Sequence, residues 1–390
     1  MKPECVLVRV GEISLKSRKT QKKMFSTLIK NIEAAIPAGY RIETNPNRIF
    51  IYTDDIEGTV GALKRVFGIT SVSPSWTCFS GLDEIKLLAS DVATEVLGLG
   101  PEKSFAVRVR RAGRHPFDSR TLAEEVGAAV KRVTGASVNL DEPDAEIWVE
   151  CRSRRTYIFV EKIPGPGGLP LGVSGRLVSL FSGGIDSPVA TWMMMKRGCE
   201  ADLLFAYFPR GGDESSLKRC VEVCSDLRKW AAGSELKLFT FRHEKSLAEF
   251  VKKGGNAVCI LCRRMMYRVA CAFAEIRGAQ GVVTGESLAQ VASQTLKNLS
   301  VINEAARLPV FRPLIGMDKE EIVSIARKIG TYESSTIPIS SGCGRFEGCW
   351  ARPEKPETSA SLERIKEIES KIDVEGLLSE ALNSIREVEL

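Results

Sequence analysis

Short apolar runs alternate with longer stretches of helical periodicity throughout the second half of the chain. Runs of strand length occur at residues 177–181, 202–208, 236–240, 281–284 and, more weakly, 310–312. Between these runs, apolar residues recur with the period of a helix at residues 217–230, 261–275 and 319–329. This alternation predicts a doubly wound parallel sheet, and a ligand is expected at the carboxyl ends of its strands.

In the first half, the pattern predicts two smaller α/β units. The first has the order β–α–β–β–α–β, with strands expected at 5–10, 40–42, 49–52 and 70–73 and helices at 14–35 and 55–66. This order is typical of a ferredoxin-like module. The second unit is expected to contain helices at 82–97 and 119–133 and strands at 105–111, 138–141, 146–150 and 156–160.

Glycine and proline mark the boundary between the two halves. They fill eight of the thirteen positions from 163 to 175, which predicts a linker. We therefore expect three domains, at residues 1–75, 76–165 and 166–355. Residues 356–390 are rich in charge and helical in pattern, and we expect them to form a helical tail packed on the surface.

Composition narrows the class of protein. A length of 390 residues with 44% hydrophobic and 27% charged residues is typical of a globular protein of several domains. No apolar run approaches the ~20 residues of a membrane-spanning helix, and the N-terminus does not resemble a signal peptide. Eleven cysteines in so long a chain indicate a reducing compartment, so we expect a cytoplasmic protein. Two histidines argue against a histidine-centred catalytic triad.

The net charge of +6 is concentrated in two segments. Residues 14–30 carry six basic side chains and no acid, and residues 101–132 carry eight basic side chains and four acids. Such surfaces suit a phosphate backbone, although a solvated helix face or a half-exposed strand explains either segment alone. The candidate RNA-binding residues are Lys16, Arg18, Lys19, Arg108, Arg110, Arg111, Arg114 and Arg120.

A glycine-rich loop follows the strand expected at 177–181. Its sequence is Ser182-Gly-Gly-Ile-Asp-Ser187, followed by Pro188. We expect Ser187 to cap the next helix and Pro188 to occupy its first position. Two glycines let the backbone approach a ligand closely, and the helix N-terminus favours an anion such as phosphate. No Gly-Lys-Ser/Thr follows, so this is not a Walker A loop. An ordinary strand–turn–helix is the alternative.

The loop resembles the PP-loop of ATP pyrophosphatases, which cleave ATP between the α- and β-phosphates. The resemblance implies adenylation of a substrate oxygen, with pyrophosphate as the leaving group. Asp186 is a candidate catalytic residue. Because a carboxylate repels bare phosphate, Asp186 is expected either to bind Mg²⁺ or to hold the loop in shape.

A second motif makes the resemblance closer. It runs Thr284-Gly-Glu-Ser-Leu-Ala-Gln-Val-Ala-Ser-Gln-Thr295 and follows the strand expected at 281–284, so it lies at the same sheet edge as the loop. This motif, the loop and Gly11-Glu-Ile-Ser-Leu-Lys16 resemble the tRNA 4-thiouridine synthetase (tRNA sulfurtransferase) family. That family has the domain order expected here: a ferredoxin-like domain, a THUMP RNA-binding domain and a PP-loop domain.

The resemblance implies a substrate, cofactors and partners. ATP would adenylate O4 of a tRNA uridine, and sulfur would then displace AMP to give 4-thiouridine. The partners implied are tRNA, a sulfur donor (sulfide or a cysteine desulfurase) and a second copy of the chain in a homodimer. The ATP site would comprise Leu180, Phe181, Ser182, Gly183, Gly184, Ile185, Asp186, Ser187, Phe205, Ala206, Arg263, Gly285 and Gln294.

Cysteines in the expected PP-loop domain are candidates for sulfur chemistry. Longer family members carry a rhodanese domain, whereas the shorter branch with Cys-x-x-Cys resembles enzymes that hold an iron–sulfur cluster on three cysteines. The resemblance assigns Cys259, Cys262 and Cys343 to the cluster, with Cys343 at the family's reactive-cysteine position. Soft thiolates suit iron–sulfur clusters or zinc. If Cys349 also binds, four thiolates would resemble structural zinc, and metal-free thiol chemistry is a third possibility.

Two other functions are compatible with the sequence. One is a different adenylating PP-loop enzyme that acts on a small molecule or another tRNA base. The other is an RNA-binding protein whose nucleotide domain regulates binding without turnover. The region that resembles a THUMP domain argues against a small substrate, and the intact loop at 182–187 argues against a silent domain.

Overall fold

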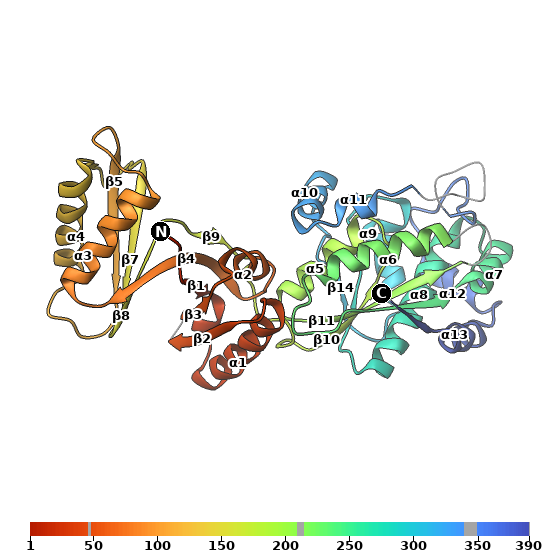
Figure 1. The fold of residues 1–390 in the computed structure, drawn as a ribbon. Helices are drawn as coiled ribbons and strands as arrows, with labels where there is room; N and C mark the ends of the chain where they lie inside the picture. The colour runs from red at the N-terminus through yellow and green to blue at the C-terminus, as the bar shows by residue number, and fades with distance from the viewer. Residues whose placement is uncertain (46–47, 209–213, 339–348, 390) are drawn as a thin grey trace. The chain divides into compact units, whose positions relative to one another are not determined.

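The computed structural model describes residues 1–45, 48–208, 214–338 and 349–389. The chain divides into two compact units, Met1–Gly168 and Leu169–Leu390 (Figure 1). The predicted class, an α/β protein with a ferredoxin-like domain, a second small α/β domain and a doubly wound domain, is confirmed.

In the described residues of the first unit, nine strands form one sheet. Eight of them run in the order β2-β3-β1-β4-β8-β7-β5-β6, and β9 pairs with β4. Their bounds are β1 Cys5–Val10, β2 Tyr40–Asn45, β3 Arg48–Thr53, β4 Ile69–Phe79, β5 Ser104–Arg111, β6 Ser137–Val138, β7 Ala145–Cys151, β8 Arg155–Phe159 and β9 Ile163–Pro164. The long strand β4 pairs with β1 in the ferredoxin-like half and with β8 in the other half.

Four α-helices lie in the described part of the first unit, together with a short 3-10 helix at Glu12–Leu15 and a π-helical turn at Val92–Val96. The α-helices are α1 Arg18–Ala35 and α2 Ile56–Leu63 in the ferredoxin-like half, and α3 Leu82–Asp91 and α4 Ser119–Thr134 in the second half. Asp118 caps α4 by accepting a hydrogen bond from the Thr121 amide, and Gly135 ends it in the left-handed conformation. Apolar residues of α3 and α4 form one core with strands β4, β5, β7 and β8.

Aromatic and charged contacts join the two halves of this unit. Phe50 of β3 stacks on Tyr157 of β8 with ring centroids 4.1 Å apart. Beside them, Nε of Arg48 donates to the buried carboxylate of Glu150 at 2.8 Å. Since these partners are more than a hundred residues apart in the chain, they hold the halves together through tertiary contacts.

The second unit contains the predicted doubly wound sheet. Its strand order is β14-β13-β10-β11-β12-β15, and the first five are parallel. The strands are β10 Arg176–Leu180, β11 Glu200–Tyr207, β12 Lys237–Arg242, β13 Val282–Val283, β14 Val310–Phe311 and β15 Arg386–Val388. The chain proceeds from β10 to β11 and β12 on one side, then continues with β13 on the other side of β10. The strand order therefore reverses between β10 and β13, where ligands bind in such sheets.

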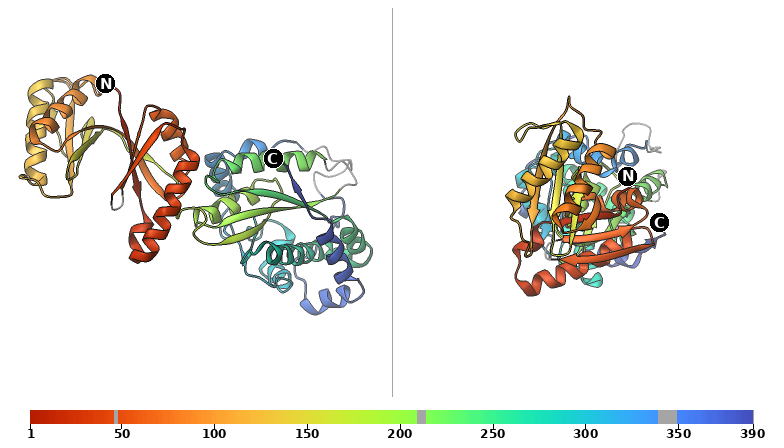
Figure 2. Two further views of the ribbon diagram at one scale, coloured as in Figure 1. Left: turned by 60° about the horizontal axis from the view of Figure 1, so that its bottom comes forward. Right: turned by 60° about the vertical axis from the view of Figure 1, so that its left-hand side comes forward.

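Helices cover both faces of this sheet. The helices are α5 Asp186–Lys196, α6 Glu214–Arg228, α7 Glu244–Gly254, α8 Val258–Arg277, α9 Leu296–Asn303, α10 Lys319–Ile329, α11 Tyr332–Ser335, α12 Leu362–Glu369 and α13 Val374–Asn383. Val178 of β10 lies in the core with α8, whereas the next residue, Ser179, contacts Thr191 of α5 at 2.7 Å. In the left view of Figure 2, the green helix α6 and the teal helix α8 lie on opposite sides of the strands.

The C-terminal residues belong to this core, which corrects the predicted surface tail. Ala360 and Ile365 are fully buried in the same cluster as α8, and β15 pairs antiparallel with β12. Both oxygens of Glu369 accept hydrogen bonds from Arg264, which is itself 1% exposed. Charge was taken as a sign of solvent exposure, but here the charges of α8 and α12 pair with each other.

Among the described residues, none of the helices is long and apolar enough to cross a membrane.

Candidate active site

The glycine-rich loop connects β10 to α5 at the carboxyl edge of the sheet. Gly183 adopts a positive φ of 68°, and a Cβ there would stand 2.9 Å from Cα of Cys220 in α6. Only glycine fits both the conformation and the space. Leu180 and Phe181 end the strand as predicted, and the Phe181 amide continues the ladder to Leu204 at 2.9 Å.

Ser187 does not cap the helix, which corrects the prediction. The helix begins at Asp186, so Pro188 is its third residue and not its first as predicted, and the N-cap residue Ile185 makes no side-chain hydrogen bond to the first turn. Instead, the Ser187 hydroxyl accepts a hydrogen bond from the Ser182 amide at 3.0 Å and lies 3.3 Å from the Ser182 hydroxyl. The Ser187 hydroxyl therefore bonds within the loop and does not cap α5. The amides at the start of a helix can bind an anion when the N-cap side chain does not occupy them.

Gly285 brings the second motif against this loop. A Cβ on Gly285 would stand 2.8 Å from the Ser187 amide nitrogen and 2.9 Å from the Asp186 carbonyl carbon. The motif follows β13 and the loop follows β10, so the two meet where the strand order reverses. The prediction that both motifs lie at one edge of the sheet is confirmed.

Asp186 is held by two side chains from other elements. Nζ of Lys319, the first residue of α10, lies 2.6 Å from Oδ1 of Asp186, and Nε2 of Gln290 donates to Oδ2 at 3.2 Å. Of the two roles predicted for Asp186, these contacts favour holding the loop. A Mg²⁺ ion at this carboxylate would need Lys319 to move away, because a cation repels a cation.

A buried carboxylate organises the region beside Gly285. Glu286 is 2% exposed and accepts hydrogen bonds from Arg263 at 2.6 Å, Tyr267 at 2.6 Å and Arg312 at 2.7 Å. Burial alone would raise the pKa of Glu286, but Arg263, Tyr267 and Arg312 outweigh burial and lower it below its ordinary value. The carboxylate therefore stays charged.

Three other predicted ATP contacts line the same edge. Phe205 and Ala206 are in the last part of β11, beside the loop that follows β10. Gln294 is 5% exposed, and its Oε1 has no hydrogen-bond partner in the described part of the chain. A buried amide oxygen without a partner costs free energy unless a ligand satisfies it, so Gln294 fits a residue that completes its hydrogen bonds when ligand binds.

The Cys-x-x-Cys pair lies in the first turns of α8. Sγ of Cys262 is 3.3 Å from Nε2 of His243, and His243 is fully buried. Burial lowers the pKa of His243 to about 4, so the ring is neutral at pH 7. Burial raises the pKa of Cys262 to about 12, and the neighbouring thiol of Cys349 adds to this shift.

The third predicted cluster cysteine, Cys343, lies outside the described residues. Cys349 lies close enough to Cys259 and Cys262 to raise the pKa of both thiols, after burial. Within the described ranges, no three Cys, His, Asp or Glu side chains are grouped closely enough to hold a metal ion. The thiols of Cys259 and Cys262 in α8 suit a soft metal. A cluster held by three cysteines, as predicted, would also need Cys343, which lies outside the described residues.

Sequence reasoning missed four residues of this edge: Glu286, Gln290, Lys319 and His243. Glu286 and Gln290 were inside the quoted motif, but a pattern does not reveal which members face inward. Lys319 starts a helix 133 residues after Asp186, and no local sequence pattern predicts the ion pair between them. A single buried histidine is usually a core residue, and its position beside Cys262 is evident only in three dimensions.

The predicted RNA-binding residues separate into two groups. Lys16, Arg18 and Lys19 are exposed at the start of α1, and their side chains make no ion pair with any described residue. Arg110 and Arg114 are also exposed. By contrast, Arg108 pairs with Glu146 at 2.8 Å and Arg120 with Glu124 at 2.8 Å. Arg111 donates to the Gly113 carbonyl at 3.2 Å.

Arg9 forms a further basic centre that the sequence did not single out. It lies over the ring of Phe159 at 4.5 Å, and its Nη2 is buried without a hydrogen-bond partner among the described residues. Burial lowers the pKa of Arg9 to about 10; Glu150 acts in the opposite direction, while Arg48 and Arg110 lower it further. The first unit therefore collects positive charge where its two halves meet.

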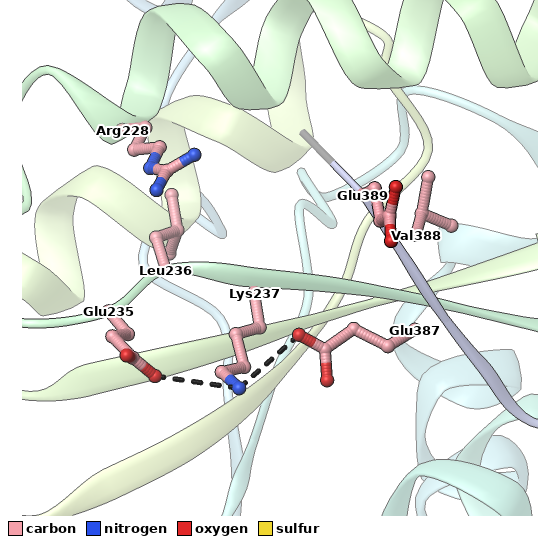
Figure 3. A pocket seen from close by; sticks show the side chains of 7 residues that line it. All are labelled: Arg228, Glu235, Leu236, Lys237, Glu387, Val388 and Glu389. Atoms are coloured by element: carbon pink, nitrogen blue, oxygen red, sulfur yellow. Dashed lines mark ion pairs between the residues drawn. The ribbon is translucent and has the colours of Figure 1, made fainter.

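A cavity of about 440 Å³ lies at the other end of the strands (Figure 3). Its wall includes Lys237, the first residue of β12, which pairs with Glu235 at 3.5 Å and Glu387 at 3.2 Å. Since ligands of such sheets bind at the carboxyl ends, this cavity is separate from the candidate site.

Family models match almost the whole chain. The model described as thiamine biosynthesis protein (ThiI) matches residues 172–374, the ThiI ferredoxin-like domain matches residues 5–73 and the THUMP domain matches residues 79–161. A protein of Methanothermobacter thermautotrophicus named "Probable tRNA sulfurtransferase" is 39% identical over 97% of this chain and 96% of its own length. The chain belongs to the tRNA sulfurtransferase (ThiI) family.

Other members and solved structures agree with this family. The tRNA sulfurtransferase of Pyrobaculum aerophilum is 38% identical over 94% of this chain and 73% of its own length. A 4-thiouridine synthetase solved in complex with RNA and ATP has a TM-score of 0.89 and 32% identity, with both chains covered completely. The PH1313 protein of Pyrococcus horikoshii has a TM-score of 0.66 and 26% identity over 84% of this chain. The predicted family and fold are confirmed.

Proposed function

We propose that this sulfurtransferase converts a tRNA uridine to 4-thiouridine in two steps, with ATP as co-substrate. Uridine O4 attacks the α-phosphorus of ATP, and pyrophosphate leaves. A sulfur nucleophile then adds to C4, and the C4–O4 bond breaks with release of AMP. The observation that carries the proposal is the contact of Gly285 with the start of α5, which unites the loop at 182–187 and the motif at 284–295 in one site.

The chain's own groups fit the first step. The loop amides and the uncapped start of α5 are suited to phosphate, and Arg263 and Lys319 add positive charge at the same edge. Leu180, Phe181, Phe205, Ala206 and Gln294 are proposed to hold the nucleotide. Mg²⁺ is expected to arrive with ATP, as it does in other phosphoryl and nucleotidyl transfers.

For the second step, we propose that Cys259 and Cys262 hold an iron–sulfur cluster together with Cys343. Such a group, when bound, would supply the sulfide for the displacement. His243 lies against Cys262 and is fully buried, so it fixes the orientation of that thiol. The alternative is metal-free sulfur transfer through a persulfide at Cys343. Iron and acid-labile sulfide in anaerobically purified protein, compared between the wild type, Cys262→Ala and Cys349→Ala, separate the two.

The tRNA partner is proposed to bind the first unit. Its exposed basic residues at the start of α1 and its THUMP match are consistent with the RNA bound by the solved 4-thiouridine synthetase. The homodimer and the sulfur donor, sulfide or a cysteine desulfurase, remain predictions of the family resemblance, and the cytoplasmic location remains a prediction from the cysteine content.

The test is incubation with tRNA, ATP and sulfide under anaerobic conditions, followed by nucleoside analysis. The proposal expects 4-thiouridine together with AMP and pyrophosphate in equal amounts. Pyrophosphate release that needs no tRNA would instead indicate a small-molecule substrate. Tight tRNA binding without any nucleotide turnover would indicate an RNA-binding protein.

A further inference from the structure

Glu286 has an unusual set of partners for a buried carboxylate. It accepts hydrogen bonds from two guanidinium groups and from the hydroxyls of Tyr267 and Thr284, the latter at 3.0 Å. One negative charge is thus shared by two positive charges, which leaves a net charge of +1 in a largely buried place. An anion brought to this site would complete the balance.

The two arginines that share Glu286 are held differently. Nη2 of Arg312 also donates to Asn303 at 2.9 Å and to the Tyr267 hydroxyl at 3.1 Å, so Arg312 is fixed from several sides. Arg263 makes its one side-chain hydrogen bond to a described residue through Nη1, and 25% of its side chain is exposed. Arg263 therefore keeps donors available to a ligand, whereas Arg312 mainly neutralises the carboxylate.

The position of Glu286 links these arginines to the loop. The preceding residue, Gly285, lies against the Ser187 amide, so a shift of Glu286 would displace the backbone at the start of α5. Gly285, Glu286 and Arg263 therefore connect the glycine-rich loop, the motif at 284–295 and α8 through direct contacts.

We propose that Glu286 is a positioning residue for adenylation, which holds the Arg263 guanidinium where it meets a phosphate of the bound nucleotide. This inference rests on the proposed function, since it needs ATP at the loop. Glu286 itself is too buried to touch the nucleotide, so it acts through Arg263.

The experiment measures ATP binding directly, together with the KM for ATP and kcat for pyrophosphate release. Glu286→Gln keeps the shape of the side chain and removes its charge. Losing a charge-assisted hydrogen bond that orients a ligand-binding arginine should weaken ATP binding about tenfold or more. The effect should fall on ATP affinity, with tRNA affinity unchanged. In an Arg263→Ala background, Glu286→Gln should cause no further loss of ATP affinity, because the guanidinium that Glu286 positions is already absent.

Glu369 provides a matched control. It too holds two arginines of α8, Arg264 and Arg268, but it comes from α12, and its side-chain hydrogen bonds to described residues all go to these two arginines. Glu369→Gln should lower stability and leave ATP affinity unchanged. Glu304→Gln, which also removes a partner of Arg264, is a milder version of the same control.

The outcomes are distinct. Unchanged ATP affinity in Glu286→Gln, losses that add in the double variant, or an equal loss of affinity in Glu369→Gln would each overturn the inference. If Glu286→Gln does not fold, Glu286→Asp closes the same cycle with Arg263→Ala. Failure of the wild-type protein to bind ATP would refute the proposed function itself, before any variant is compared.

Discussion

The ammonium of Lys319 lies 2.6 Å from the carboxylate of Asp186, although the two residues are 133 positions apart. Asp186 starts the helix that follows the glycine-rich loop, and Lys319 starts α10. The pair places a positive charge beside the loop. The ammonium of Lys319 also offsets the repulsion that the carboxylate of Asp186 would exert on a bound phosphate.

Lys319→Met should therefore lower the rate of pyrophosphate release by at least about tenfold while the melting temperature barely changes. Nearly half of the Lys319 side chain is exposed, and exposed ion pairs contribute little to stability. Loss of a cation that stabilises developing phosphate charge commonly costs this much in rate. A variant with normal pyrophosphate release would show that Lys319 only holds the loop.

Gly285→Ala should abolish ATP binding. The new methyl group would stand 2.8 Å from the Ser187 amide nitrogen, and backbone atoms of the loop and helix would have to move. Gly316→Ala is the matched control, since its Cβ would meet nothing within 4 Å. Calorimetric titration with ATP measures both. Equal affinities in the two variants would contradict the assembly of one site from two motifs.

Glu369→Gln should destabilise the second unit by roughly 1.5–3 kcal/mol at pH 7, because it removes the negative charge that accepts hydrogen bonds from buried Arg264, while Glu304 still pairs with that arginine. Burial alone would raise the pKa of Glu369, but hydrogen bonds from Arg264 and Arg268 lower it below its ordinary value. A carboxylate with a lowered pKa contributes its stability above the unfolded pKa of about 4.3, and loses it as pH falls through the folded pKa.

The difference in stability between wild type and Glu369→Gln should consequently be constant from pH 7 to about pH 5 and shrink in more acidic solution. Urea unfolding followed across this range measures it. A difference that grows as the pH falls would contradict the assigned sign.

Removing Lys16, Arg18 and Lys19 together should weaken tRNA binding without affecting stability. If each contacts a phosphate, the slope of log affinity against log salt should fall by roughly 2 to 3 in all. Arg108→Ala should differ, since Arg108 pairs with Glu146 and the Leu140 carbonyl and its loss should cost stability first. Titration of tRNA at several salt concentrations tests both, and an unchanged slope in the triple variant would remove these residues from the RNA surface.

The sequence predicted the elements that local pattern controls. Apolar runs located β10, β11 and most of β12, and the glycine pair located the loop, because burial and backbone freedom leave local signatures. The helix α7 was missed, and so was α9, which begins at Leu296 immediately after the quoted motif.

The parts that sequence could not provide depend on pairing across the fold. Ser187 was expected to cap α5, but its hydroxyl bonds to Ser182 instead, since the loop turns back on itself. The charged C-terminal residues were expected at the surface, whereas Glu369 meets Arg264 in a buried contact. The charge of a side chain can be read from the sequence, but its ion-pair partner often lies on a segment far away in the chain, and the local pattern does not identify that partner.

The central claim is that uridine O4 becomes bonded to the α-phosphorus of ATP before sulfur replaces it. The most direct measurement uses tRNA whose target uridine carries ¹⁸O at O4, incubated anaerobically with the protein, ATP and sulfide. The account predicts that the released AMP carries the ¹⁸O and the pyrophosphate carries none, in step with formation of 4-thiouridine. Formation of 4-thiouridine with unlabelled AMP would contradict it.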